Sequence, residues 1–191
     1  MNQGYVGPRG ALSARKIGAR RAPLVWRLRN ALRWAFIKGW IAFHVIAPFA
    51  NWWGVMTAMA TLQIRVKRAD GWVDYGVVGY RVITDAGVAY LVDDWDGGAD
   101  DMNELDFHGC GTGATAENAN QTALVTERTT ALNPNSTRAS GTNSQPAANQ
   151  FRTVGTLTFD ADAAVTEHGI FDQAATGGGT LWDRTVFSAI N

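Results

Sequence analysis

Acidic residues are missing from the first 69 positions of this 191-residue sequence, because the first of them is Asp70. Twelve of the 17 basic residues lie in that segment, so residues 1–69 carry a formal charge of +12. Residues 70–191 hold all 17 acids and five arginines, which gives a formal charge of −12 (5 minus 17). This separation predicts that the two parts contact different partners, or that copies assemble head to tail.

Cysteine is also nearly absent, since Cys110 is the only one. A single cysteine excludes an intrachain disulfide and a zinc site built from several thiolates. Together with the neighbouring His108, it makes at most half of a zinc site. Catalysis by Cys110 would need His168 or another base close by. The glycine-rich turn 109–113 lacks the lysine of a phosphate-binding loop. We therefore expect no enzymatic activity, no cofactor and no metal.

The acids are concentrated in residues 93–106, around two glycines. A segment of this composition is typical of a solvated surface loop, and it lacks the residue order of an EF-hand. If a cation bound there, its ligands would come from Asp94, Asp96, Asp100 and Asp101.

Tryptophan is unusually abundant, and five of the eight tryptophans fall between residues 26 and 53. From Pro23 onward, apolar residues recur every three or four positions opposite a cationic face, which predicts an amphipathic helix. Such a density of aromatic surface indicates a contact with a partner or a membrane boundary. The predicted partner-binding anchor residues are Trp26, Arg27, Arg33, Trp34, Trp40, Trp52 and Trp53.

Residues 39–62 contain no formal charge and are long enough to span a bilayer. Pro48, Asn51 and Gly54 interrupt this run, and basic residues flank both of its ends. A cleaved leader would be far longer than usual. We favour an apolar helical anchor buried against other protein, with membrane insertion of 39–62 as the alternative.

After residue 62 the sequence changes to short alternating segments separated by glycines, which predicts strands. The predicted strands are 63–67, 73–78, 80–82, 124–130, 151–160, 165–171 and 181–190. A strand or short helix is expected at 87–92, a short helix at 114–122, and at 133–149 a long loop with room for an edge strand centred on Arg138. The fold is therefore expected to be mainly β, with an antiparallel β-sandwich or barrel-like C-terminal domain. The expected organisation is a flexible basic segment 1–22, a Trp-rich helical anchor 23–62 and a β domain 63–191.

The second part of the sequence resembles structural proteins of tailed bacteriophages over roughly residues 72–191. The blocks that carry the resemblance are 74–79, 108–113, 115–118, 122–127, 151–158, 165–171 and 181–191. In similar proteins a further strand follows the last block. Without it, the edge of strand 181–190 would need a neighbour's strand or the 63–92 strands to cover it.

The resemblance implies a non-enzymatic component located in the virion. We expect a capsid decoration (cement) or minor capsid protein, with a tail or fibre module that binds the host surface as an alternative. The expected partners are other virion proteins, either the major capsid protein or connector and tail proteins, and copies of the chain itself. Interleaved tryptophans make nucleic acid an unlikely partner for the basic segment, whereas a membrane remains possible.

Overall fold

The computed structural model describes residues 19–55, 57–98 and 101–191, and this part of the chain is mainly β. The strands are β1 (Arg20–Arg21), β2 (Ala60–Arg68), β3 (Gly71–Ile83), β4 (Phe107–Gly111), β5 (Ala139–Ala147), β6 (Gln150–Gly155), β7 (Val165–Phe171) and β8 (Leu181–Ile190). The helices are α2 (Leu24–Ala31), α3 (Trp34–Ile41), α4 (Ala47–Trp52) and α5 (Asp85–Asp96), with a π-helical turn at Ala42–Ile46 and a 3₁₀ turn at Met102–Glu104.

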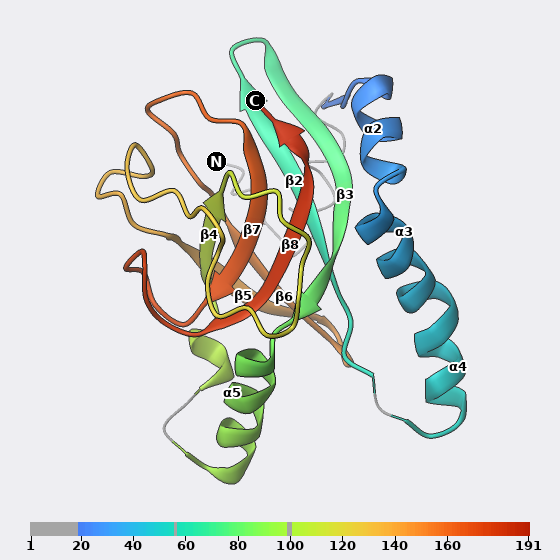
Figure 1. The fold of residues 1–191 in the computed structure, drawn as a ribbon. Coiled ribbons are helices and arrows are strands. Elements are labelled where there is room, and N and C mark those ends of the chain that lie inside the picture. Colours follow the sequence, from blue (N-terminus) through green and yellow to red (C-terminus); the bar gives the residue numbers. More distant parts are fainter. Residues whose placement is uncertain (1–18, 56, 99–100) are drawn as a thin grey trace, which may run out of the picture.

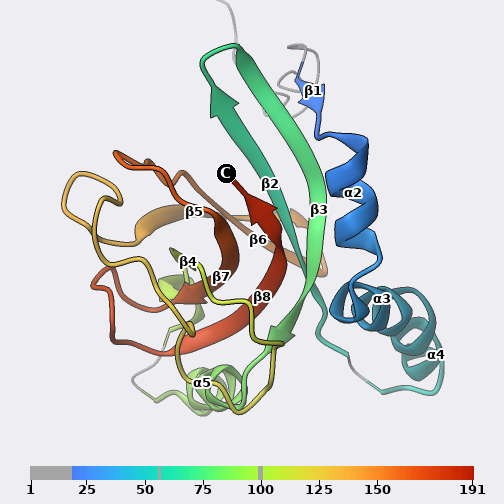
Figure 2. The same ribbon diagram turned by 45° about the horizontal axis from the view of Figure 1, so that its top comes forward.

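The described strands form one sheet in the order β1-β3-β8-β7-β4-β5-β6, with β2 paired to β3. Every pairing is antiparallel except the short parallel contact between β1 and β3. Figures 1 and 2 show this sheet curling into a half barrel, with the helices α2 to α4 along one side and α5 at one end. The mainly β prediction is confirmed. A sandwich of two sheets is not, because these strands follow a single hydrogen-bonded path.

Strands β7 and β8 form the centre of the sheet, and their bounds agree with the predicted ranges 165–171 and 181–190. Neighbouring residues on a strand point to opposite faces. Accordingly Glu167 pairs with Arg184 on one face, whereas His168 and Asp183 both contact Arg81 on the other. Both faces of the strand pair are therefore covered, which explains why most of β8 is buried.

Buried charges hold the irregular segment 112–138 against the sheet. The Glu167 carboxylate is fully buried and accepts hydrogen bonds from the backbone N–H groups of Gly113 (3.0 Å), Val125 (3.1 Å) and Thr126 (2.7 Å). Arg184 donates to the same carboxylate through Nε (2.8 Å) and Nη2 (2.7 Å). Five donors on one buried carboxylate satisfy its charge.

A second ion pair fixes the other end of this segment. Arg138 donates to both carboxylate oxygens of Glu127, at 2.7 and 3.1 Å, and to the carbonyl oxygens of Gln173 and Gly178. Its guanidinium lies 3.4 Å from the ring centroid of Phe171, in cation–π geometry. The two ion pairs replace regular pairing, and the predicted helix 114–122 and strand 124–130 are both wrong. Only an isolated bridge at Glu127 occurs there.

Asn30 of α2 joins two strands that diverge. β3 pairs directly with β8 only at Val82 and Ile83. Farther along, the Asn30 side chain donates from Nδ2 to the Val78 carbonyl and accepts from the Ser188 N–H, both at 2.8 Å. The buried amide thus stands in for a missing main-chain pair. Together with β3, it covers the β8 edge for which the sequence required a partner.

Three clusters of buried apolar side chains stabilise the fold. The first lies between β2, β3 and β8 and the second under α5; the third lies beside β7. Their buried members are Leu62, Val78, Phe187 and Ile190; Tyr90, Leu105 and Ile170; and Leu124, Phe171 and Leu181.

The acidic segment 93–106 differs most from its prediction as a loop. Helix α5 continues through Asp96, and Leu105 is buried in the core. The helix begins at an N-cap, Thr84, whose hydroxyl accepts a hydrogen bond from the Gly87 N–H at 2.9 Å. It ends at Gly97, which has a φ of 77° that favours glycine.

The remaining differences concern boundaries. The helices end at Trp52 and β2 begins at Ala60, whereas the sequence predicts helix to residue 62. The predicted loop 133–149 contains β5, which forms a hairpin with β6. The prediction of a flexible segment 1–22 lies mostly outside the described residues, and within it Arg20–Arg21 pair with β3.

Candidate docking surface

Residues 24–52, called the helical arm below, pack along β3 with one face. At the start of the arm, the Trp26 indole donates to the Ala189 carbonyl at 2.8 Å and contacts the Tyr75 ring edge-on at a centroid distance of 4.7 Å. Asn30 follows one turn later and is buried. These spacings place Trp26 and Asn30 on the inward face.

Tyr80 of β3 is the second point of attachment. Its ring contacts Phe36 at 5.3 Å and Phe43 at 5.6 Å between centroids, and burial raises the pKa of its hydroxyl. A Cβ on Gly39 would lie only 2.4 Å from the Tyr80 Cβ. The absence of a side chain at Gly39 therefore lets α3 approach the sheet closely.

The outward face of the arm is apolar and unusually exposed. Trp34 is 69% exposed and Trp52 is 78% exposed. The other large apolar residues of the arm with exposed side chains are Leu24, Val25, Leu28, Leu32, Trp40, Ile41, Val45, Ile46 and Phe49, and Trp53 and Val55 follow directly. Many large apolar side chains left exposed along one segment indicate a site of interaction.

The charges of the arm are all positive. Arg27, Arg29 and Lys38 are exposed, and the arm contains no Asp or Glu. Arg33 is half-buried: burial lowers its pKa, while the nearby Glu117 carboxylate acts in the opposite direction. The outward face therefore combines tryptophan and aliphatic surface with exposed cations.

The predicted anchor residues thus separate into two groups. Trp26 and Arg33 contact the β domain of their own chain, whereas Arg27, Trp34, Trp52 and Trp53 point to solvent. Trp40 is intermediate, because its indole stacks on His44 with 4.8 Å between ring centroids. Trp52 and Trp53 lie edge to face at 5.6 Å. That these seven residues contact a partner stays a prediction.

No helix among the described residues is long and apolar enough to cross a membrane.

A buried hydrogen-bonded chain of polar groups lies inside the half barrel. His168 Nδ1 is 3.1 Å from Arg81 Nη2, His168 Nε2 is 3.1 Å from His108 Nδ1, and His108 Nε2 is 3.1 Å from Thr153 Oγ1. Arg81 also pairs with Asp183. Because Arg81 can only donate, each histidine accepts at Nδ1 and donates from Nε2–H.

Both imidazoles of this hydrogen-bonded series, His108 and His168, are therefore neutral. Burial, assisted by the Arg81 charge, lowers the pKa of His108 to about 4 and that of His168 well below its usual range. Burial raises the pKa of Asp183 despite its partner Arg81. The hydrogen bonds connect side chains from β3, β4, β6, β7 and β8. The geometry of these hydrogen bonds explains the buried polar groups as cross-links between strands.

Cys110 lies on β4 in the same interior and is buried. Burial raises the pKa of its thiol to about 12, so the thiolate needed for nucleophilic attack is not populated near neutral pH. The described residues contain no cluster of three or more His, Cys, Asp or Glu side chains that could hold a metal. Asp100, one of the four aspartates considered as cation ligands, lies outside the described residues.

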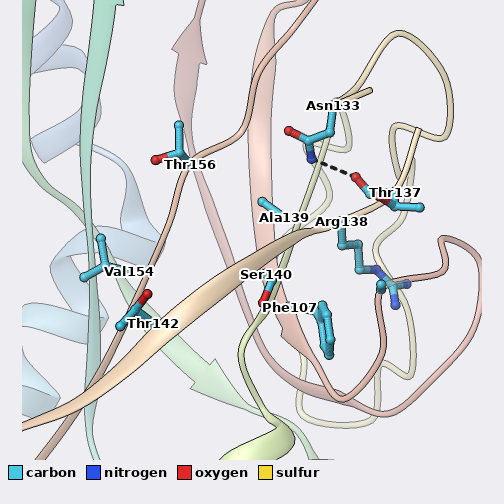
Figure 3. A pocket seen from close by; sticks show the side chains of 10 residues that line it. Phe107, Asn133, Thr137, Arg138, Ala139, Ser140, Thr142, Val154 and Thr156 are labelled. Atoms are coloured by element: carbon cyan, nitrogen blue, oxygen red, sulfur yellow. Dashed lines mark hydrogen bonds between the residues drawn. The ribbon is translucent and has the colours of Figure 1, made fainter. Parts of the chain in front are cut away.

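An open depression lies beside β4, β5 and β6 (Figure 3). Phe107, Ser140, Thr142, Val154 and Thr156 contribute to its lining, which is mostly hydroxyl and methyl groups. Arg138 also borders it, but its guanidinium is committed to Glu127. The depression therefore presents little besides neutral, weakly polar groups.

No protein family, curated protein or solved structure matches the chain in comparisons with known proteins.

Sequence reasoning missed one exposed feature, the outer face of α5. Val88, Val92 and Trp95 are spaced four and three residues apart and are all exposed. The capping residue Thr84 and this spacing were available in the sequence. The surrounding aspartates, which are typical of loops, concealed them.

Proposed function

We propose that the chain is a non-enzymatic structural subunit of a tailed-bacteriophage virion, a capsid decoration or minor capsid protein. In this proposal the helical arm attaches the subunit to other virion proteins. The observation that carries it is the outward face of the arm, where exposed tryptophans lie among aliphatic side chains and cations. The kind of assembly, a phage virion, is inferred from the resemblance of residues 72–191 to structural proteins of tailed phages.

The arm is suited to docking because its inward residues hold it in place before any partner arrives. Trp26, Asn30 and Tyr80 join the arm to the sheet through hydrogen bonds and aromatic contacts. A face that is already ordered loses little conformational entropy on binding. Large aromatic side chains at such a face commonly contribute most of the binding free energy.

The buried polar groups support a structural role. His108, His168 and Arg81 connect strands, and the Glu127–Arg138 and Glu167–Arg184 pairs attach loops to the sheet. Each of these side chains has a partner that explains its position, although the buried Nε of Arg81 makes no hydrogen bond. A rigid body that carries an exposed arm is what a subunit of a larger particle requires.

A second candidate function is attachment to a membrane surface. Tryptophan, aliphatic side chains and arginine on one helical segment are typical of helices that lie in the lipid interface. The exposed Trp34 and Trp52, with Arg27, Arg29 and Lys38, provide this combination. Anionic vesicles would then bind the arm.

A sedimentation assay separates the two candidates. The full-length chain is mixed either with purified phage particles that lack it or with anionic lipid vesicles, at about 500 mM salt to screen weak charge attraction. The proposal expects co-sedimentation with the particles and loss of it in Trp34→Ala/Trp52→Ala, with Phe151→Ala as an exposed aromatic control on β6. Binding to vesicles alone would overturn the proposal and favour the membrane surface.

A further inference from the structure

Helix α5 presents an apolar stripe to solvent. Val88 is 51% exposed, Val92 is 55% exposed and Trp95 is 65% exposed, and their spacing places them on one face. The opposite face packs on the body, where Gly87 and Tyr90 are buried. A Cβ on Gly87 would lie 2.4 Å from the Trp182 carbonyl oxygen, so the helix is firmly seated. The stripe is therefore held rigidly.

The surroundings of the stripe are acidic. Asp85 and Asp96 are exposed, and the helical spacing places Asp85 beside Val88 and Asp96 beside Val92 on the outer side of α5. Asp101 and Glu104 are exposed in the segment that follows. No Lys or Arg occurs in the sequence between Arg81 and Arg128. The exposed charges on α5 and in the segment that directly follows it are thus all negative.

The outward face of the helical arm is its complement in shape and charge. Both surfaces are apolar faces of helices; α5 is edged by acids alone, and the arm carries cations alone. The 12-residue α5 is about 18 Å long and the helical run from α3 through α4 about 28 Å, so α5 matches part of the arm. Two such helices can pack side by side, with Lys38 of this run, and Arg27 and Arg29 of α2 before it, as the cations that face the acids.

The two surfaces cannot meet within one chain. In both Figure 1 and Figure 2 α5 lies at the end of the half barrel, while the arm runs along β3 on another side. The inward residues Trp26 and Asn30 fix the arm in that place. The α5 surface of one copy is therefore available to the arm of another.

We infer that the outward face of the helical arm docks on the α5 stripe of a second copy, so that subunits associate head to tail. A contact between two different surfaces is heterologous, and it produces a ring or a filament depending on the rotation between copies. The inference rests on the proposed function and names one partner of the arm. It also assigns a role to the exposed stripe of α5, which takes no part in the proposed attachment of the arm to other virion proteins.

Two exposed-surface variants test the inference by complementation. The arm variant is Trp34→Ala/Ile41→Ala, the α5 variant is Val92→Ala/Trp95→Ala, and the matched control on β6 is Phe151→Ala/Val154→Ala. All six side chains are exposed, and circular dichroism checks that each variant is folded. Sedimentation velocity then measures the mass distribution of the full-length chains over a range of concentrations and salt.

Head-to-tail contact predicts a distinctive pattern. The unmodified chain and the control form species larger than a dimer, while each variant alone sediments as a 20.6 kDa monomer. A 1:1 mixture of the two variants forms dimers and nothing larger, because one intact arm meets one intact α5. The association constant of each variant alone falls at least about tenfold, as truncation of aromatic contacts typically causes. High salt weakens the association.

Three results would overturn the inference: an unmodified chain that stays monomeric, an α5 variant that still forms the larger species, or a variant mixture that stays monomeric. The proposed function fails separately, when the chain is absent from virions. If the chain is monomeric in solution but present in virions in an arm-dependent manner, the proposed function stands and α5 is not the arm's partner.

Discussion

At the scale of residues, side chains replace main-chain pairing where strands diverge or loops cross the sheet. Asn30 bridges β3 and β8, and Glu167 collects three backbone N–H groups from the segment 112–126. Each of these groups is buried, so each must keep its partners. Single substitutions there are expected to cost more than substitutions of exposed residues of the same type.

Asn30→Asp tests the bridge. Aspartate keeps the acceptor for the Ser188 N–H but loses the donor to the Val78 carbonyl and introduces a buried charge. We expect the free energy of unfolding, measured by urea denaturation, to fall by about 2 kcal/mol or more. Asn149→Asp, at an exposed turn, is the control and should change it by less than about 0.5 kcal/mol. Equal effects would refute the bridging role.

Glu167→Gln tests the loop clamp. The amide replaces a carboxylate oxygen that accepts hydrogen bonds with an NH₂ group that faces donors, and it leaves Arg184 without a counter-charge. We expect a loss of about 3 kcal/mol or more in the free energy of unfolding. The exposed Glu104→Gln serves as control. A clamp variant as stable as this control would show that the carboxylate is dispensable.

The buried histidines make stability depend on pH. The unfolded His108 has a pKa of 6.5 and the folded one about 4, so the unfolded state binds more protons between these values and stability falls as the pH is lowered through this window. For His108 alone the loss between pH 6.5 and 5 is about 1.5 kcal/mol, and His168 acts in the same direction.

Urea denaturation at a series of pH values measures this slope. The raised pKa of Asp183 opposes this slope. The folded Asp183 binds its proton at a higher pH than the unfolded one, so acidification through that range favours the folded state. A free energy of unfolding that is constant between pH 5 and 6.5 would contradict neutral, buried imidazoles.

At the scale of elements, the fit of the arm to the sheet depends on one glycine. In Gly39→Val the new side chain meets the Tyr80 Cβ, which a Cβ alone would approach to 2.4 Å. We expect the arm to separate from β3 while the sheet stays folded. Overpacking costs of about 1–3 kcal/mol correspond to trypsin cleavage at Arg33 and Lys38 that is about 5-fold to about 150-fold faster.

The exposed Ala31→Val variant of the same arm is the control, and its cleavage rate should match that of the unmodified chain. If Gly39→Val is cleaved no faster than this control, the arm is held in another way than by close approach to Tyr80.

The sequence predicts some elements well and others not at all, for physical reasons. β7 and β8 are predicted at their observed ends because β-branched and aromatic residues lie between turns. For α5 the sequence leaves strand and short helix open at 87–92 and predicts a loop from 93, because aspartates favour loops, although the Thr84 cap stabilises the helix. The segment 112–138 is beyond local patterns, since ion pairs with residues far along the chain hold it. The aromatic surface of the arm could be predicted from composition. The inward position of Trp26 could not, because it depends on contacts with β8.

At the scale of the whole molecule, the separation of charge along the sequence becomes a separation in space. The cationic arm runs along β3, and the acidic α5 occupies the end of the half barrel (Figures 1 and 2). Each carries an apolar face that no described part of the chain covers. A molecule with two unlike, complementary surfaces is suited to repeated assembly, which agrees with the proposed role in a particle.

The most direct test of the central claim is the number of copies of the chain in density-gradient-purified virions of the phage that is proposed to encode it. Quantitative mass spectrometry would compare the unmodified chain with Trp34→Ala/Trp52→Ala and with the control Phe151→Ala. The account predicts a fixed number of copies per virion for the unmodified chain and the control, and loss of the chain from virions for the arm variant. Virions without the chain, or with the arm variant at the unmodified copy number, would contradict it.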